Sequence, residues 1–203
     1  LRDYFNKPRS IAMLYSLITL FPVIVAIMMR HNFLSVYIVP FAMVPMFVRV
    51  FMDSRTAFIS HVTMLLICTI AVRYQYEFII IQIVAGLIAI YSLRELTRRA
   101  QVFKTGILVA MGSALVYLAL QMIQDNDFTI MDHDMYYHFV VNGVLLLLAY
   151  PLMYIVEKMF GFVSSVTLFE LSNTNRGLLR DLSEIAPGTF QHSITVGNLA
   201  AEI

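Results

Sequence analysis

The sequence predicts an all-α membrane protein, a polytopic helix bundle followed by the first helices of a soluble all-α domain. Hydrophobic residues make up 60% of its 203 residues and charged residues only 13%, whereas soluble domains contain about 25% charged residues. Long apolar runs fill most of the chain, and the composition becomes that of a soluble domain only from Leu171. Backbone groups in lipid must be satisfied within helices or closed barrels, and the sequence lacks the alternation of barrel strands.

Six apolar runs, separated by charged residues, justify the bundle. A helix needs about 20 residues to cross the hydrocarbon core, with a range of about 17 to 25. The fourth run is short, but Glu77 and Arg94 at its ends can snorkel to the interface. We therefore predict a transmembrane bundle over residues 1–161 with six spans, at about residues 10–29, 31–48, 56–72, 78–93, 105–124 and 135–156.

Prolines and glycines inside the runs predict how these helices bend and pack. Prolines are expected to kink helices, and four lie within spans, at Pro22, Pro40, Pro45 and Pro151. Glycines let two helices approach closely, and they occur at Gly86, Gly106, Gly112 and Gly143.

The positive charges lie almost entirely on one side of the predicted membrane. Of the 14 Lys and Arg residues, only Arg30 and Arg73 fall in loops on the other side. Because cytoplasmic loops carry the excess of Lys and Arg, we expect both ends of the chain to be cytoplasmic in a multi-pass protein of the cell membrane. The first residue, Leu1, is not methionine, and Ile203 falls within a predicted helix, so we expect a fragment of a longer protein.

Two features of the membrane part could carry chemistry. One is the loop with the sequence QDNDFTIMDHDMYYH, in which Asp125, Asp127, Asp132, His133 and Asp134 crowd together. Oxygen ligands of this kind bind divalent cations, but the glycine and glutamate of an EF-hand loop are lacking, so a solvated acidic loop on the outer side is the favoured interpretation.

The other feature is His61, an ionisable residue inside the third predicted span. Such residues are functional candidates. No carboxylate lies one helical turn away, so we expect a neutral histidine hydrogen-bonded to a neighbouring helix.

The tail changes from membrane to soluble character. After a candidate helical extension over residues 162–170, apolar residues recur with helical spacing, and Arg180 and Glu184 lie one turn apart on the polar side. Pro187 and Gly188 break this helix, and Thr189 can cap the next one. We expect both apolar stripes to be buried and His192 to point inward, either as a core histidine or as a metal ligand.

The segment LFELSNTNRGLLRDLSEIAPGTFQHSITVGNLAAEI, residues 168–203, resembles the opening of the HD-type metal-dependent phosphohydrolase domain of seven-transmembrane receptors with an intracellular HD domain. The ELSN run, the LLR segment and the HS pair before a VGNLA helix carry this resemblance together. It implies that residues 1–161 are a sensor and transducer, that residues 162–171 are a cytoplasmic connector, and that residues 172–203 begin an incomplete HD phosphohydrolase domain.

In that family the histidine of the HS pair is the first of the H…HD…D ligands that hold two divalent metal ions, iron or manganese. By position this ligand is His192, and Gln191 before it receives no metal role. The resemblance places the HD dyad and the final aspartate beyond Ile203, and an external sensor domain with one more span before Leu1. No catalytic site is therefore complete in this chain, and residues 1–203 alone are expected to be inactive.

The family includes the PgpH-type cyclic di-AMP phosphodiesterases of bacteria. The resemblance therefore implies a membrane-bound signalling enzyme that hydrolyses cyclic di-AMP to linear pApA, with two metal ions activating a water. Its expected partners are cyclic di-AMP, membrane lipid, an unknown extracellular signal and a second copy in a homodimer. The sequence has no basic patch with interleaved aromatics, so no nucleic-acid polymer is expected. The alternative is a receptor-like or transport bundle without hydrolase activity.

Overall fold

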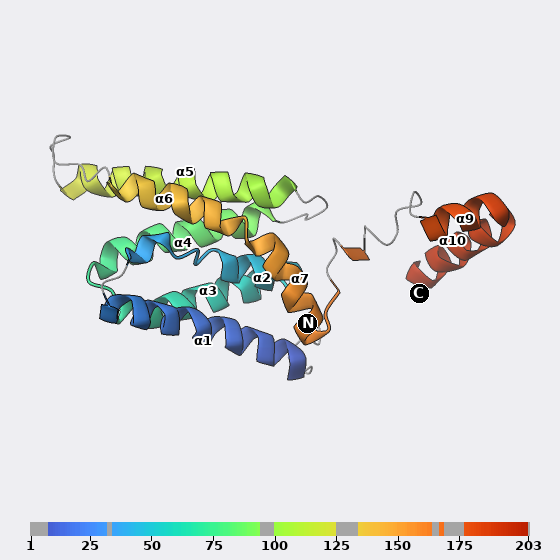
Figure 1. Ribbon diagram of the computed structural model, residues 1–203, viewed down its shortest axis with the longest axis horizontal. Coiled ribbons are helices and arrows are strands. Elements are labelled where there is room, and N and C mark those ends of the chain that lie inside the picture. The colour runs from blue at the N-terminus through green and yellow to red at the C-terminus, as the bar shows by residue number, and fades with distance from the viewer. Residues whose placement is uncertain are drawn as a thin grey trace. The chain divides into compact units, whose positions relative to one another are not determined.

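The computed structural model describes residues 8–31, 34–93, 100–124, 134–163, 167–168 and 177–202, and the chain divides into two compact units, Leu1–Ser164 and Ser165–Ile203. Every regular element in these described ranges is a helix, which confirms the all-α fold class. The elements of the first unit are α1 (Pro8–His31), the 3₁₀ turn η2 (Val36–Ile38), α2 (Met43–Phe51), α3 (Ser54–Thr69), α4 (Gln75–Ser92), α5 (Ala100–Gln124), α6 (Asp134–Leu146) and α7 (Ala149–Phe160) (Figure 1).

The structure does not confirm six membrane spans. Among the described helices, α1, α4 and α5 are long and apolar enough to cross a membrane, and α6 with α7 makes a fourth if this bent pair is one span. The predicted second span differs most, because its residues form the turn η2, an irregular stretch and the nine-residue helix α2. Pro40 and Pro45 explain this break, since each removes a backbone donor from a helical ladder.

The predicted kink at Pro151 is observed between α6 and α7. The two helices meet at an angle of 43° across a break at residues 147–148, in the turn just before Pro151. Pro151 has no N–H to donate toward Leu147, so the helical ladder is interrupted there. By contrast, α1 continues through Pro22 as a single helix.

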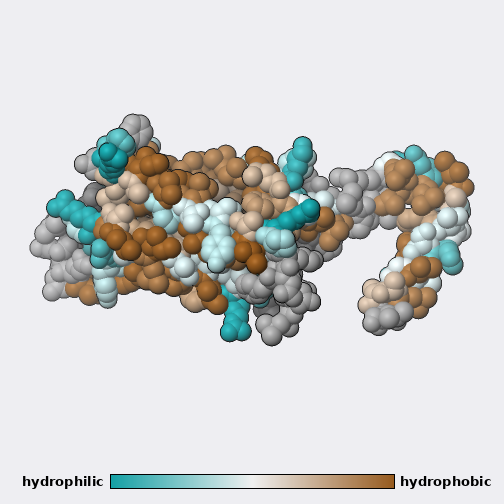
Figure 2. Space-filling view, turned by 90° about the horizontal axis from the view of Figure 1, so that it is seen from below, coloured by the Kyte–Doolittle hydropathy of each residue, from teal (hydrophilic) through white to brown (hydrophobic). Residues whose placement is uncertain are grey.

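The first unit is apolar both inside and outside. An aromatic cluster lies in its core, in which a chain of ring contacts joins Phe21 to Phe41, Phe78, Tyr37 and Phe139 in turn. Large hydrophobic side chains on α1, α3 and α5 are exposed as well, and apolar residues cover much of the face seen in Figure 2. Helices that are hydrophobic all round suit a lipid environment, as expected of a multi-pass membrane protein.

Close approaches of helices occur at the glycines that the sequence singled out. A Cβ added at Gly106 would lie 2.8 Å from the carbonyl oxygen of Gly143, and one added at Gly143 would lie 3.0 Å from the carbonyl oxygen of Gly106. Helices α5 and α6 therefore pack backbone against backbone, as small residues permit in membranes. The hydroxyls of Ser92 and Thr105 lie 2.7 Å apart and join α4 to α5.

Helix α3 begins with a side-chain cap that gives a testable prediction. The carboxylate of Asp53 accepts a hydrogen bond of 2.8 Å from the backbone N–H of Thr56. Replacing Asp53 with alanine should lower the free energy of unfolding by about 1 kcal/mol, the typical cost of losing an N-cap. Urea or thermal unfolding in detergent measures this, and Asp53→Asn, which keeps an acceptor oxygen, should retain most of the stability.

The same cap predicts a pH dependence. Hydrogen bonding from Thr56 lowers the pKa of the Asp53 carboxyl below its usual value. A carboxyl with a depressed folded-state pKa stabilises the protein above its unfolded pKa of about 3.9, and this contribution is lost as the pH falls through the folded value. The difference in stability between wild type and Asp53→Asn should therefore shrink in acid; a difference that grows there would contradict the cap.

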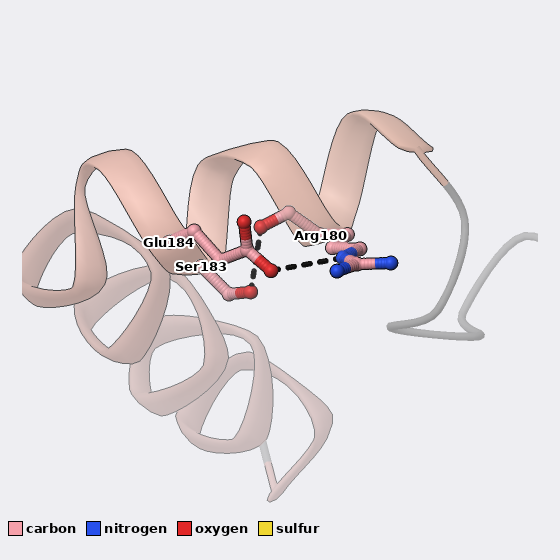
Figure 3. A network of polar contacts seen from close by, with 3 residues as sticks. All are labelled: Arg180, Ser183 and Glu184. Atoms are coloured by element: carbon pink, nitrogen blue, oxygen red, sulfur yellow. Dashed lines mark hydrogen bonds and ion pairs between the residues drawn. The ribbon is translucent and has the colours of Figure 1, made fainter.

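The second unit consists of α9 (Gly177–Ile185) and α10 (Pro187–Glu202), which pack on each other. The predicted pair on its polar side is present, with Arg180 Nε donating to Glu184 Oε1 at 2.8 Å (Figure 3). The Ser183 hydroxyl donates to the Arg180 carbonyl in the same turn. Both charged side chains are largely exposed, so the pair adds at most about 0.5 kcal/mol to the helix.

Two expectations about the tail need correction. Helix α10 begins at Pro187, whose missing N–H is harmless in the first turn, so Thr189 lies inside the helix and does not cap it. The helical extension predicted over residues 162–170 does not continue from the membrane helix. Helix α7 ends at Phe160 and is capped by Gly161, which has φ +68°, and residues 161–163 are not helical. A left-handed glycine is a common helix terminator because it has no Cβ to clash.

Candidate functional site

The predicted metal ligand His192 lies in the second turn of α10, in the second unit. Its side chain is exposed, and no described residue of α9 or α10 is buried. The expected inward orientation and the expected burial of both apolar stripes are therefore not seen; Leu178 is 85% exposed and Leu199 58%. The physical reason is size, because two helices packed on each other cannot cover an apolar stripe on each of them.

The described residues do not form a metal site. Within them, no group of three or more His, Cys, Asp and Glu side chains lies close enough together to hold a metal ion. His192 presents an accessible imidazole, which suits one ligand position, but the described chain brings no further ligand to it. Most of the acidic loop that could bind a cation, including Asp125, Asp127, Asp132 and His133, lies outside the described residues.

The expectation for His61 is confirmed. Its side chain is fully buried, and Nε2 lies 2.9 Å from the backbone oxygen of Gln82 on α4. That carbonyl is reachable because Gly86, one turn along, leaves open the space that a Cβ would fill. The Nδ1 atom is buried and without a partner among the described residues. This arrangement makes His61 a contact between α3 and α4, and no described carboxylate completes a proton relay with it.

Asn142 on α6 is a structural residue that the sequence reasoning missed. Its Nδ2 donates to the carbonyl of Tyr37 at 3.0 Å and to that of Val39 at 2.8 Å. The irregular stretch after η2 needs this donor, because Pro40 has no N–H with which to continue the 3₁₀ turn onto Tyr37. Non-helical backbone at membrane depth is tolerated only where such groups are satisfied. An asparagine inside an apolar run was the available signal.

Replacing Asn142 with leucine, which has a similar volume, should destabilise the first unit by about 1–3 kcal/mol. The Tyr37 carbonyl would be buried without a donor, which is the cost of an unsatisfied polar group, whereas Val39 keeps its bond from the Phe41 N–H. Thermal unfolding in detergent measures the loss. The control is Thr63→Val, which removes a hydroxyl that donates only within its own helix. Equal stability of the two variants would contradict the role of Asn142.

A cavity of about 610 Å³ opens at one end of the bundle, where α5 ends and α6 begins (left in Figure 1). It is lined by residues from α1, η2, α4, α5 and α6 and from the segments just before η2 and α4. Three tyrosines, Tyr37, Tyr74 and Tyr117, lie around it together with Arg73 and Glu77. Sequence reasoning did not find this site, because its residues come from several segments spread between positions 29 and 138 and no motif links them.

Several polar atoms of this cavity lack partners in the described part of the chain. The hydroxyl of Tyr37 is buried without a hydrogen bond, and so is Nδ1 of His138, which also lines the cavity. The hydroxyl of Tyr117 accepts a hydrogen bond of 2.8 Å from Gln121 Nε2, and both residues line the cavity. The cavity therefore combines apolar walls with polar and aromatic groups.

Fold and sites together define a polytopic membrane protein whose helix bundle continues into a separate small helical unit. The sequence matches the family described as "7TM receptor with intracellular HD hydrolase" over residues 1–164, so the chain belongs to that family. No solved structure matches the chain.

The chain is also similar in sequence to three individual proteins. The chain is 29% identical over 208 residues to the cyclic-di-AMP phosphodiesterase PgpH of Bacillus subtilis, covering 96% of this chain and 29% of the relative. It is 26% identical over 170 residues to the protein of the same name from Listeria monocytogenes, covering 81% and 23%. An uncharacterized protein of Synechocystis is 34% identical over 131 residues, covering 62% and 16%. The chain thus spans less than a third of the length of these relatives.

Proposed function

We propose that the protein is a membrane-bound signalling phosphodiesterase that hydrolyses cyclic di-AMP to linear pApA. The observation that carries this proposal is the similarity to two relatives named as cyclic-di-AMP phosphodiesterases, which covers 96% and 81% of this chain. The family description, which joins a membrane receptor part to an intracellular HD hydrolase, supports the same combination.

The similarity extends into the second unit, which supports a role for the tail. An alignment that covers 96% of the chain leaves only about eight of the 203 residues outside it. Wherever this alignment begins, it therefore includes His192, which lies 11 residues before the last residue. In the proposed enzyme, α9 and α10 are the first helices of the hydrolase domain, and the apolar side chains exposed on them, such as Leu178 and Leu199, are covered by the remainder of that domain.

His192 is proposed as one ligand of a pair of divalent metal ions, manganese or iron. When bound, such ions activate a water molecule and stabilise the charge that develops on the phosphate and on the leaving oxygen. This chain would contribute an imidazole nitrogen from the second turn of α10, held on a regular helix. The family resemblance assigns the other ligands to residues beyond Ile203, so residues 1–203 alone should not hydrolyse the substrate.

The bundle is proposed to transmit an external signal, with both ends of the chain on the cytoplasmic side. The bias of Lys and Arg toward one side supports this orientation. It places the end of the bundle that carries Arg73 outside and the end that carries Arg9 and Lys158 inside. Helix α7, which leads toward the tail, would connect the bundle to the enzyme through the capped end at Gly161.

The proposed function is tested by assaying the full-length protein in lipid nanodiscs with cyclic di-AMP and manganese. We expect metal-dependent formation of pApA, detected by chromatography, and no product from residues 1–203 alone. The linear dinucleotide pApA as starting material controls for a general phosphodiesterase and should be consumed far more slowly. Absence of pApA from the full-length protein with metal present would refute the proposal.

A further inference from the structure

We propose that the cavity between η2 and the facing ends of α4, α5 and α6 binds a small zwitterion, an amino acid or dipeptide with one ammonium and one carboxylate. The cavity volume of about 610 Å³ lies in the usual range of small-molecule sites, about 300–1,000 Å³. It is too large to be a packing gap and contains one acidic side chain among its described lining residues, which is too few for a metal ion.

The charges of the lining match a ligand that carries one charge of each sign. Arg73 and Glu77 are the only described lining residues with formal charges, and they come from one short stretch at the start of α4. Neither forms an ion pair with another described residue, so both charges are available to a ligand. Glu77 is half-buried whereas Arg73 is exposed, which orients the ammonium of the ligand inward and its carboxylate toward the mouth.

The aromatic residues favour an ammonium at the inner end. Tyr37 and Tyr117 are buried, whereas Tyr74, which also lines the cavity, is exposed. Tyrosine rings attract a cation within about 6 Å of the ring centre. The exposed ring of Tyr74 already holds the guanidinium of Arg73 at 5.8 Å, which keeps that positive charge on the outer side. The Tyr37 hydroxyl, buried without a partner, offers the hydrogen bond that its burial otherwise leaves unmade.

The remaining lining residues indicate the chemistry of the middle of the ligand. Met29, Leu34, Val36, Val72 and Met135 line the cavity with apolar surface. A short aliphatic side chain on the ligand would fill this surface without needing further polar partners. An amino acid or dipeptide with an apolar side chain therefore satisfies both the charged and the apolar walls.

The test uses the dipeptide alanyl-leucine as a probe on the full-length protein in nanodiscs, with binding measured by calorimetry. We expect saturable binding with a Kd below about 1 mM. N-acetylation or C-terminal amidation of the probe should each weaken binding about tenfold or more, equivalent to about 1.4 kcal/mol. Binding is read without any hydrolysis assay, so its failure would leave the proposed enzymatic function untouched.

Variants of the two charged residues test which end of the probe each residue binds. Glu77→Gln should weaken binding of alanyl-leucine about tenfold but leave binding of the acetylated probe unchanged. Arg73→Gln should likewise weaken binding of alanyl-leucine about tenfold but leave binding of the amidated probe unchanged. Tyr37→Phe should weaken binding of the unmodified probe, whereas Tyr15→Phe, at an exposed site on α1 away from the cavity, should not. No saturable binding, or binding that is insensitive to both charge variants in folded protein, would overturn the proposal; unchanged melting temperatures establish folding.

Discussion

Replacing His192 with alanine should lower the rate of cyclic di-AMP hydrolysis by the full-length protein by several orders of magnitude. Residues that merely orient a metal ligand cost about 10- to 100-fold when they are mutated, and a ligand itself should cost more. Because the side chain is exposed on α10, the substitution removes no packing from the described structure. The helix should tolerate it well, since alanine has the best helix propensity.

Two measurements separate this ligand role from a structural one. Manganese bound per protein, measured by elemental analysis, should fall together with activity in His192→Ala. The matched control is Gln191→Ala, a neighbouring exposed position on the same helix with no assigned metal role. Unchanged activity and metal content in His192→Ala would remove the assignment, as would an equal loss in both variants.

Replacing Gly86 with alanine should destabilise the bundle by about 2–4 kcal/mol. The added Cβ would overlap Cδ2 and Nε2 of His61, a rigid ring that is fully buried between α3 and α4. Overpacking of this kind costs about 1–3 kcal/mol, and loss of the bond from His61 to the Gln82 carbonyl adds about 1 kcal/mol more. Thermal or denaturant unfolding of the protein in detergent measures the change.

A double variant, in which a smaller side chain at His61 compensates for the larger one at Gly86, tests the cause of this loss of stability. The double variant Gly86→Ala with His61→Ala should be more stable than the sum of the two single changes predicts, because the smaller side chain makes room for the added methyl. Gly112→Ala is the matched control. Its Cβ would meet only the side chain of Ile88, with the clash at Cδ1, the end of a flexible chain, so it should cost much less. Equal losses at Gly86 and Gly112, or no coupling with His61, would contradict the close contact.

Local features of the fold were predictable where short-range chemistry determines them. The ion pair of Arg180 with Glu184 follows from helical spacing, and the bend near Pro151 follows from a missing donor. The buried, hydrogen-bonded His61 also followed from its position in an apolar run. Each of these outcomes depends on a few neighbouring residues and on rules that hold in any helix.

The features that were predicted wrongly from the sequence depend on long-range packing. Hydropathy predicted a span over residues 31–48, but the structure has a turn and a short helix there, because Asn142, more than 100 positions away, satisfies the irregular backbone. The spacing around His192 predicted an inward side chain, but the direction is inward only if other helices cover that face. Hydropathy reports how apolar a segment is and does not report which partner supplies its hydrogen bonds.

The sequence by itself determined the class of the protein, because excess apolar composition and helical periodicity allow only a helical membrane bundle with a soluble tail. It also carried the motif residues, including His192, since a motif is a property of neighbouring positions. Only the tertiary structure decided where the bundle is interrupted and that Tyr37, Glu77 and Tyr117 share one cavity. The reason is that a cavity is formed by side chains from distant segments, whose meeting depends on the free energy of packing the whole bundle.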